Sequence, residues 1–302
     1  MSRLQPLPAA LSHRPFRVAD AVAMGVNAER LRRSDLAAPV HGVRVAEGGD
    51  DFASFVEALS LVMRPDQFFS HTTAARLWGA PLPLAVQSDR AVHVSTSGTG
   101  PRMRRARVHG HRLSASGVIE VAGRRLSTPE DTWAQCVPLL GTRALVAVGD
   151  HFVGRSDLAT TIADLVGAIV PGSRSAVAAR TAVDLVRVGS ESAMETWFRL
   201  AIVDAGFPEP ELNVEVRDPD GRFLGRVDVA WPEHRIAFEY DGDHHRERDV
   251  FQHDQQRDNG FTVNDWIAIH ATSADVQRPA AVFEPLRQAF EQRLATVRRS
   301  AA

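Results

Sequence analysis

The sequence predicts a mixed α/β protein built from several domains. Its length of 302 residues is about twice that of a common single domain. Apolar residues at helical spacing (Met194, Trp197, Phe198 and Ala201) are followed by segments in which apolar residues alternate, as they do in strands. Because both periods occur in one region, an α/β fold is expected there. The three predicted parts cover residues 1–47, 48–188 and 189–302.

The composition is that of an ordinary soluble globular protein, with 44% hydrophobic and 24% charged residues. Residues 1–10 lack the features of a secretory signal, and no stretch is apolar over the roughly 18 residues that a membrane helix needs. Cys136 is the only cysteine, so no internal disulfide can form and a cytoplasmic protein is expected. The net charge of -2 argues against a generally basic surface. All 35 basic residues are arginine, which excludes mechanisms that require lysine.

Residues 14–45 are expected to form two short helices and a strand, a size that suits a winged helix-turn-helix. Gly25 fits the turn between the helices, and Asn27 is a suitable N-cap for the second helix. The predicted DNA-binding residues of this segment are Arg30, Arg32, Arg33 and Arg44. A small helical cap with solvated arginines is the alternative, and these residues alone do not decide between the two.

The middle of the chain contains no motif with an assigned chemistry and is expected to be a mixed α/β scaffold. Helices are predicted at 71–78 and from Thr128 onward, and strands at 91–96 and 107–113. The basic run 102–112 either contacts phosphate or protects a hairpin edge. Its His109 and His111 are spaced as metal ligands on a strand can be, but no third ligand follows at a suitable spacing, so metal binding is not expected there.

A helix after Gly189 carries two acids, Glu191 and Glu195, four residues apart. Ser192 and Glu195 fit a capping box, in which the acid binds the backbone at the start of the helix. This pattern favours a structural role for Glu195 and leaves Glu191 as the candidate functional acid.

Three strands follow and are predicted to form an antiparallel meander from Leu212 to Asp241. Alternation places Val227 and Val229 on one face of the second strand and Asp228 on the other. In the third strand it places Glu239 and Asp241 together, so three carboxylates can converge. Their repulsion is costly unless a cation offsets it, and oxygen ligands favour Mg²⁺ or Mn²⁺. A solvated face with alternating charge is the alternative, and alternation alone favours it.

The residues that follow shift the balance towards a metal site. Asp241-Gly242 reads as a turn, and a polar helix is expected to start at Asp243. The predicted helix is dense in groups that transfer protons or bind phosphate, namely His244, His245, Gln252, His253, Asp254, Gln255 and Arg257.

Together these residues resemble a known family. Glu191, G-R-V-D ending at Asp228, E-Y-D-G-x-x-H from Glu239 to His245, D-x-x-R-x-N from Asp254 and Trp266 are similar to the Vsr-like (very short patch repair) endonuclease domains of actinobacteria, a branch of the PD-(D/E)XK nuclease superfamily. The N-terminal segment resembles the winged helix of AbiEi-type antitoxins of type IV toxin-antitoxin systems. The chain departs from the family pattern before Trp266, where Asn264-Asp265 stands in place of glycine.

The resemblance implies a restriction-endonuclease-like C-terminal domain and a metal-dependent endonuclease acting on DNA. It implies Glu191, Asp228, Glu239, Asp241 and His245 as catalytic residues, with Asp228, Glu239 and Asp241 as ligands of Mg²⁺ or Mn²⁺. Arg257 would stabilise phosphate charge. The alternative is a non-catalytic antitoxin or repressor that binds DNA through the winged helix, with a cognate toxin as a further partner.

Overall fold

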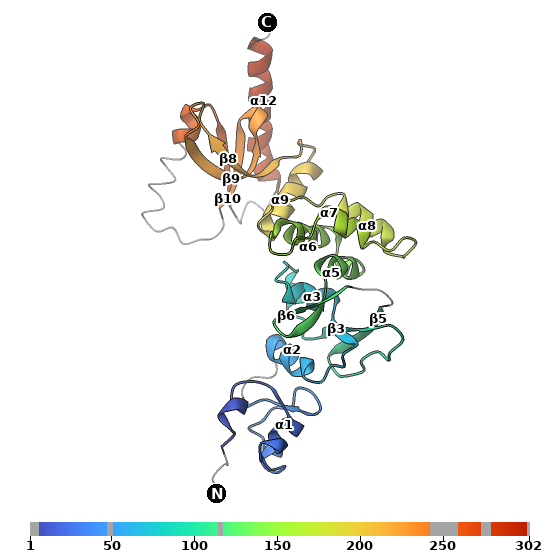
Figure 1. The fold of residues 1–302 in the computed structure, drawn as a ribbon. Helices are drawn as coiled ribbons and strands as arrows, with labels where there is room; N and C mark the ends of the chain where they lie inside the picture. The colour runs from blue at the N-terminus through green and yellow to red at the C-terminus, as the bar shows by residue number, and fades with distance from the viewer. Residues whose placement is uncertain (1–5, 47–50, 114–116, 242–258, 273–278, 301–302) are drawn as a thin grey trace. The chain divides into compact units, whose positions relative to one another are not determined.

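The computed structural model describes residues 6–46, 51–113, 117–241, 259–272 and 279–300 (Figure 1). The chain divides into two compact units, residues 1–139 and 140–302, where the sequence predicted three parts. Each unit is described by itself below. Among the described residues, no helix has both the length and the apolar character needed to cross a membrane.

The first unit begins with a small N-terminal subdomain. It contains η1 (Ala9–Leu11), β1 (Phe16–Arg17), α1 (Val18–Ala23), η2 (Arg30–Arg32) and β2 (Val43–Arg44), and β1 pairs with β2 in antiparallel fashion. Its core is formed by Leu11, Phe16, Ala21, Val26, Leu31 and Leu36.

The predicted second helix of this subdomain is reduced to the single 3-10 turn η2. The N-cap position of η2 is Glu29 and not the predicted Asn27, although Asn27 Oδ1 accepts a hydrogen bond from the Arg30 backbone N–H at 2.7 Å. The turn ends at Arg33, which is extended, and the Arg30 guanidinium forms a bidentate pair with Asp35 at 3.0 and 2.8 Å. Gly25 has a φ of +84°, as the predicted turn requires.

The rest of the first unit is a five-stranded mixed sheet in the order β5-β4-β3-β7-β6. The strands are β3 (Gln67–Phe69), β4 (Val92–Ser97), β5 (Val108–Leu113), β6 (Val118–Val121) and β7 (Arg124–Ser127), and the helices are α2 (Phe52–Ser60), α3 (His71–Leu77), α4 (Leu84–Gln87) and α5 (Pro129–Cys136). The helices and strands predicted at 71–78, 91–96, 107–113 and after Thr128 are all present. The pairing of β4 with β5 is parallel, and this sets two histidine-bearing strands side by side.

The second unit begins with helices that the sequence placed in the middle part. These are α6 (Thr142–Gly154), α7 (Ile162–Gly167) and α8 (Ala176–Val183), followed by α9 (Ala193–Asp204). Asp150 on α6 and Arg199 on α9 are each 1% exposed and lie 3.1 Å apart. Asp150 also accepts hydrogen bonds from the Arg187 backbone N–H at 2.7 Å and from Thr196 Oγ1 at 2.8 Å. This buried ion pair joins the helices to the C-terminal sheet region.

The second unit ends in a four-stranded sheet of order β11-β10-β9-β8. Its elements are β8 (Glu211–Arg217), β9 (Phe223–Trp231), η3 (Pro232–His234), β10 (Ile236–Asp241), β11 (Ile267–Thr272) and α12 (Pro279–Ser300). The predicted antiparallel meander of β8, β9 and β10 is confirmed, and β11 adds a parallel partner for β10. The mixed α/β character of the chain is thus confirmed.

The two faces of this sheet are packed differently. On one face Phe198 and Ile202 of α9 and Leu286 and Ala289 of α12 pack on Val229, Trp231, Ile236, Phe238 and Ala271. A smaller cluster contains Val216, Val227, Ala230, Ala237 and Phe261. Because Ala237 and Phe238 are adjacent on one strand, the smaller cluster lies on the face opposite the two helices.

Candidate functional site: the acidic face of the C-terminal sheet

Asp228 and Glu239 lie at the end of the antiparallel pairing of β9 with β10. The last pair is Phe238 with Val229, and Glu239 on β10 and Asp228 on β9 each lie one residue beyond it. Glu239 follows Phe238 and therefore points to the face away from α9 and α12. Glu239 is buried, at 8% exposure, and Asp228 is half-buried.

The alternation of β9 is interrupted at Asp228. The sequence predicted that Val227 and Val229 share a face, and this is wrong: Val229 packs in the larger cluster under the two helices and Val227 in the smaller one. The change coincides with an irregular position on β8. Asn213, between the pairs Leu212–Val229 and Val214–Val227, has a φ of +51°, a left-handed conformation that is uncommon for residues other than glycine.

Glu191 is held at the start of α9 by an ion pair with Arg226 of β9. The pKa of Arg226 is raised, mainly by the hydrogen bond to Glu191, with further contributions from Glu195 and Asp228. Three acids therefore surround one guanidinium. The sequence predicted Glu191 as a functional acid, and Arg226 as its partner was not predicted, because the contact joins residues 35 positions apart.

Glu195 has the structural role that was expected. Its backbone N–H donates to the Ser192 hydroxyl at 3.2 Å, which caps α9. Its carboxylate accepts hydrogen bonds from the Glu191 backbone N–H at 2.9 Å and from Asn213 Nδ2 at 2.9 Å. Through these bonds Glu195 fixes the start of the helix next to the irregular position on β8.

His270 of β11 is a further member of the site. It is the register partner of Glu239 across the parallel pair of strands, and its Nδ1 lies 3.9 Å from Glu239 Oε2. The His270 side chain is 35% exposed, so it connects the buried Glu239 carboxylate to solvent. His270 was not among the residues predicted from the sequence, where it is a single histidine within the apolar segment Ile267–Thr272.

Some predicted site residues lie beyond what the structure describes. Asp241 ends β10 in register with Thr272, which defines its backbone. His245, Arg257 and the polar segment around them fall outside the described residues.

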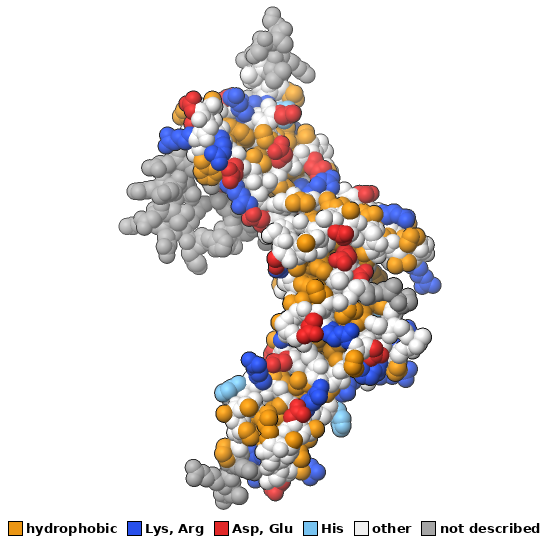
Figure 2. All heavy atoms as spheres, in the orientation of Figure 1, with side chains coloured by type: hydrophobic (Ala, Val, Ile, Leu, Met, Phe, Trp, Pro, Cys, Tyr) orange, Lys and Arg blue, Asp and Glu red, His pale blue; other side chains and the backbone are white. Residues whose placement is uncertain are grey.

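The arginines predicted to bind DNA separate into two groups. Arg30 is buried and paired with Asp35, and Arg44 donates to the backbone carbonyls of Leu31 at 2.7 Å and Val43 at 2.8 Å, so both have partners within the subdomain. Arg32 is exposed, and Arg33 is 37% exposed with Glu29 at 3.9 Å. On the face visible in Figure 2, basic and acidic side chains are intermixed, as expected for a net charge of -2.

Comparison with known proteins gives relatives without an assigned activity. The chain is 28% identical over 207 residues to the uncharacterized proteins MT2308 and Rv2248 of two Mycobacterium tuberculosis strains, a match that covers 67% of this chain and 72% of each relative. No protein-family model matches the chain. No solved structure matches it.

Proposed function

We propose that the C-terminal sheet carries a metal-dependent endonuclease of the PD-(D/E)XK type that hydrolyses phosphodiester bonds in DNA. The observation that carries the proposal is that Asp228 on β9 and the buried Glu239 on β10 each lie one residue beyond the last pair of these strands, Val229 with Phe238. A carboxylate is rarely buried beside another acid unless positive charge compensates it. The resemblance of the motifs around these residues to Vsr-like nucleases supports the same conclusion.

The donor set fits a hard divalent cation. Asp228 and Glu239 offer carboxylate oxygens, the ligands that Mg²⁺ and Mn²⁺ prefer, and Asp241 follows on the same strand as Glu239. These three residues would hold the ion. When bound, it would neutralise charge on the scissile phosphate and lower the pKa of a water molecule.

The neighbouring side chains supply the other functions that hydrolysis requires. His270, beside Glu239, can take a proton from the attacking water and pass it to solvent. Arg226 presents a guanidinium whose donors suit phosphate oxygens, and Glu191 orients it. These roles do not require a lysine, which the chain lacks.

DNA contact by the N-terminal subdomain is a second part of the proposal. It rests on the exposed Arg32 and on Arg33, which has only a distant partner. Neutralising both should weaken DNA binding and reduce the salt dependence of log K by about one unit for each lost phosphate contact. Unchanged binding and an unchanged slope would exclude this subdomain as the DNA-contacting surface.

The test is cleavage of supercoiled plasmid by the full chain with Mg²⁺ or Mn²⁺, against a reaction with chelator. We expect Asp228→Asn and Glu239→Gln to lower the cleavage rate by about 1000-fold, because each removes a charged group that acts on the transition state. Glu233→Gln is the matched control, since Glu233 is an exposed acid in η3 of the same hairpin. A wild-type protein that leaves DNA intact, or a Glu239→Gln variant that cuts equally well, contradicts the proposal. Sequence-specific binding without cleavage would favour the antitoxin or repressor alternative.

A further inference from the structure

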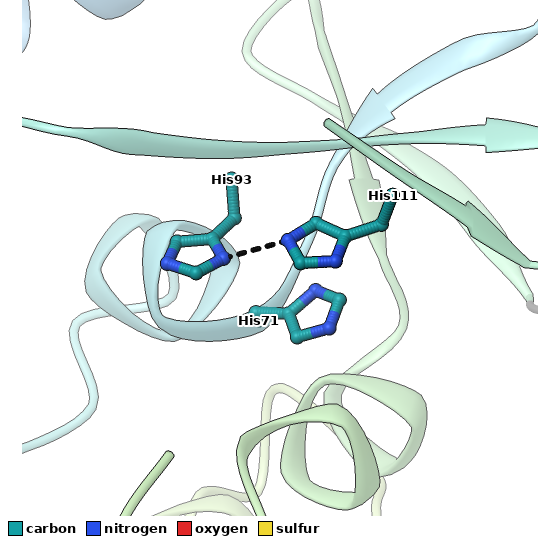
Figure 3. A group of neighbouring side chains, drawn as sticks. All are labelled: His71, His93 and His111. Atoms are coloured by element: carbon teal, nitrogen blue, oxygen red, sulfur yellow. Dashed lines mark hydrogen bonds between the residues drawn. The ribbon is translucent and has the colours of Figure 1, made fainter. Parts of the chain in front are cut away.

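Three histidines from separate elements of the first unit meet in one cluster (Figure 3). His71 begins α3, His93 lies on β4 and His111 lies on β5, and one ring nitrogen of each lies within 4.8 Å of the others. A metal site at His109 and His111 was not expected from the sequence, because no third ligand follows at a suitable spacing in the same segment. The parallel pairing of β4 with β5 and the position of α3 supply the other two ligands.

The three rings are in contact with one another. His93 Nδ1 and His111 Nε2 form a hydrogen bond of 2.9 Å, and the His71 ring stacks on that of His111 with centroids 3.9 Å apart. Two nitrogens bound at about 2.0–2.1 Å to one tetrahedral zinc ion are about 3.3 Å apart. A bound ion would therefore replace the His93–His111 hydrogen bond, and the stacked rings would turn to direct their nitrogens at it.

Metal ions bind the neutral form of histidine. His71 and His93 are buried and His111 is half-buried, so the cluster is largely shielded from water.

The surrounding structure fixes the His71 ring. Its Nδ1 is 2.9 Å from the Ser70 hydroxyl, which also accepts a hydrogen bond from the Ser95 hydroxyl at 2.7 Å. If Nδ1–H donates to Ser70, Nε2 is left as the ligand atom, the arrangement usual for a metal-binding histidine. The backbone of His71 has a φ of +52°, and its N–H is held by Gln135 Oε1 at 3.0 Å. Left-handed backbone at a non-glycine residue is uncommon and is often found at functional sites.

Gly110 sets the position of His111. A Cβ atom at Gly110 would overlap the backbone carbonyl of Met103, so only glycine allows the segment before β5 to lie against the strand at this point. Packing against Met103 thus restricts position 110, next to the proposed ligand His111, to glycine.

We propose that His71, His93 and His111 form a binding site for a first-row transition-metal ion such as Zn²⁺. Three imidazole nitrogens without a carboxylate suit Zn²⁺ and its neighbours in the series and not Mg²⁺. Three protein ligands leave a fourth position for water or a small ligand. The site would join α3, β4 and β5. It is separate from the proposed nuclease site, which has oxygen ligands and lies in the other unit.

The experiment is a Zn²⁺ titration of the full chain after treatment with chelator, read by competition with a chromophoric chelator. We expect one ion per chain at sub-micromolar affinity, weakened at least about 100-fold in His93→Asn and in His111→Gln. His41→Ala is the matched control because His41 is exposed and belongs to the N-terminal subdomain. Circular dichroism of each variant separates a lost ligand from a lost fold. Co²⁺ in place of Zn²⁺ should give visible d–d absorption. Loss of this absorption in His111→Gln would show directly that His111, which is half-buried, binds the metal.

Two results would overturn the assignment. The first is binding no tighter than micromolar, or binding that His93→Asn and His111→Gln leave unchanged. The second concerns His109, whose ring centroid is 4.9 Å from that of His93 but which is exposed. We expect His109→Ala to weaken binding by less than tenfold; a loss as large as that of His111→Gln would move the site away from His71.

Discussion

The acidic face of the C-terminal sheet and the histidine cluster of the first unit solve the same problem in different ways. Both bring ionisable side chains together across neighbouring strands. The acidic face holds carboxylates together with the cationic side chain of Arg226 and with His270. The histidine cluster holds three imidazoles stacked on one another, two of them buried. Carboxylate oxygens suit a hard cation such as Mg²⁺, whereas imidazole nitrogens suit a transition-metal ion such as Zn²⁺.

The largest expected effect is that variants of one site lose the function of that site and keep the function of the other. Removing both carboxylates with Asp228→Asn and Glu239→Gln should lower plasmid cleavage by at least about 1000-fold, or about 4 kcal/mol, and leave one Zn²⁺ bound per chain. His93→Asn should abolish tight zinc binding and leave the plasmid cleavage rate unchanged. Cleavage rates and zinc stoichiometry measured on the same preparations test this independence. A zinc stoichiometry that falls in the carboxylate variant would show that the two sites are not distinct.

The second effect is stabilisation of the folded first unit by Zn²⁺ bound to the histidine cluster. Free Zn²⁺ at 100 times its dissociation constant should stabilise the first unit by about 2.7 kcal/mol, because it binds the folded state. Thermal unfolding with Zn²⁺, with Mg²⁺ and with chelator measures it. The shift should vanish in His111→Gln and persist in Glu239→Gln. A zinc-induced shift of equal size in His111→Gln would place the bound ion elsewhere.

A third effect separates the packing of the histidine cluster from its chemistry. Gly110→Ala adds one methyl group against the Met103 carbonyl and should destabilise the first unit by about 1–3 kcal/mol. It should also weaken zinc binding, since His111 is the next residue. Gly167→Ala, at the exposed end of α7 in the second unit, is the control, because a Cβ atom there meets nothing within 4 Å. Denaturant unfolding of the two variants gives the comparison, and equal stability would show that the backbone near His111 is free to adjust.

The smallest effect is expected at the exposed ion pair of the acidic site. Glu191→Gln breaks the contact with Arg226, but the side chains are 62% and 45% exposed, so water replaces much of the interaction. Stability should fall by less than about 1 kcal/mol. The cleavage rate should fall by a larger factor than this loss of stability explains, since Arg226 loses the partner that orients it. A cleavage rate equal to that of wild type would remove Glu191 from the functional residues.

Local patterns in the sequence predicted much of the fold. The proline after Thr128 predicted the start of α5, and Ser190 or Ser192 was expected to cap α9, which Ser192 does. Alternation predicted the meander from β8 to β10. These features depend on residues within a few positions of each other, so a single sequence contains the information. In the N-terminal subdomain, local patterns predicted a second helix, but the chain forms only the turn η2. The turn ends before Arg33, and Arg30 pairs with Asp35 just beyond it.

Features that depend on distant residues were not predictable in this way. The histidine cluster joins elements through a parallel pairing that no local spacing encodes. The change of cluster between Val227 and Val229 coincides with the left-handed Asn213 on another strand. Of the candidate site, the neighbouring strands that carry Asp228 and Glu239 could be inferred, while Arg226 and His270 required the fold.

The buried pair of Asp150 and Arg199 links the acidic sheet to helices that precede it in the sequence. A segment that began at residue 189 would keep Arg199 and its second partner Glu209 but lose Asp150, the partner that is itself buried. Removing one member of a buried ion pair is strongly destabilising. The smallest stable fragment that carries the acidic sheet is therefore expected to include α6 and to begin near Leu140, where the compact unit begins.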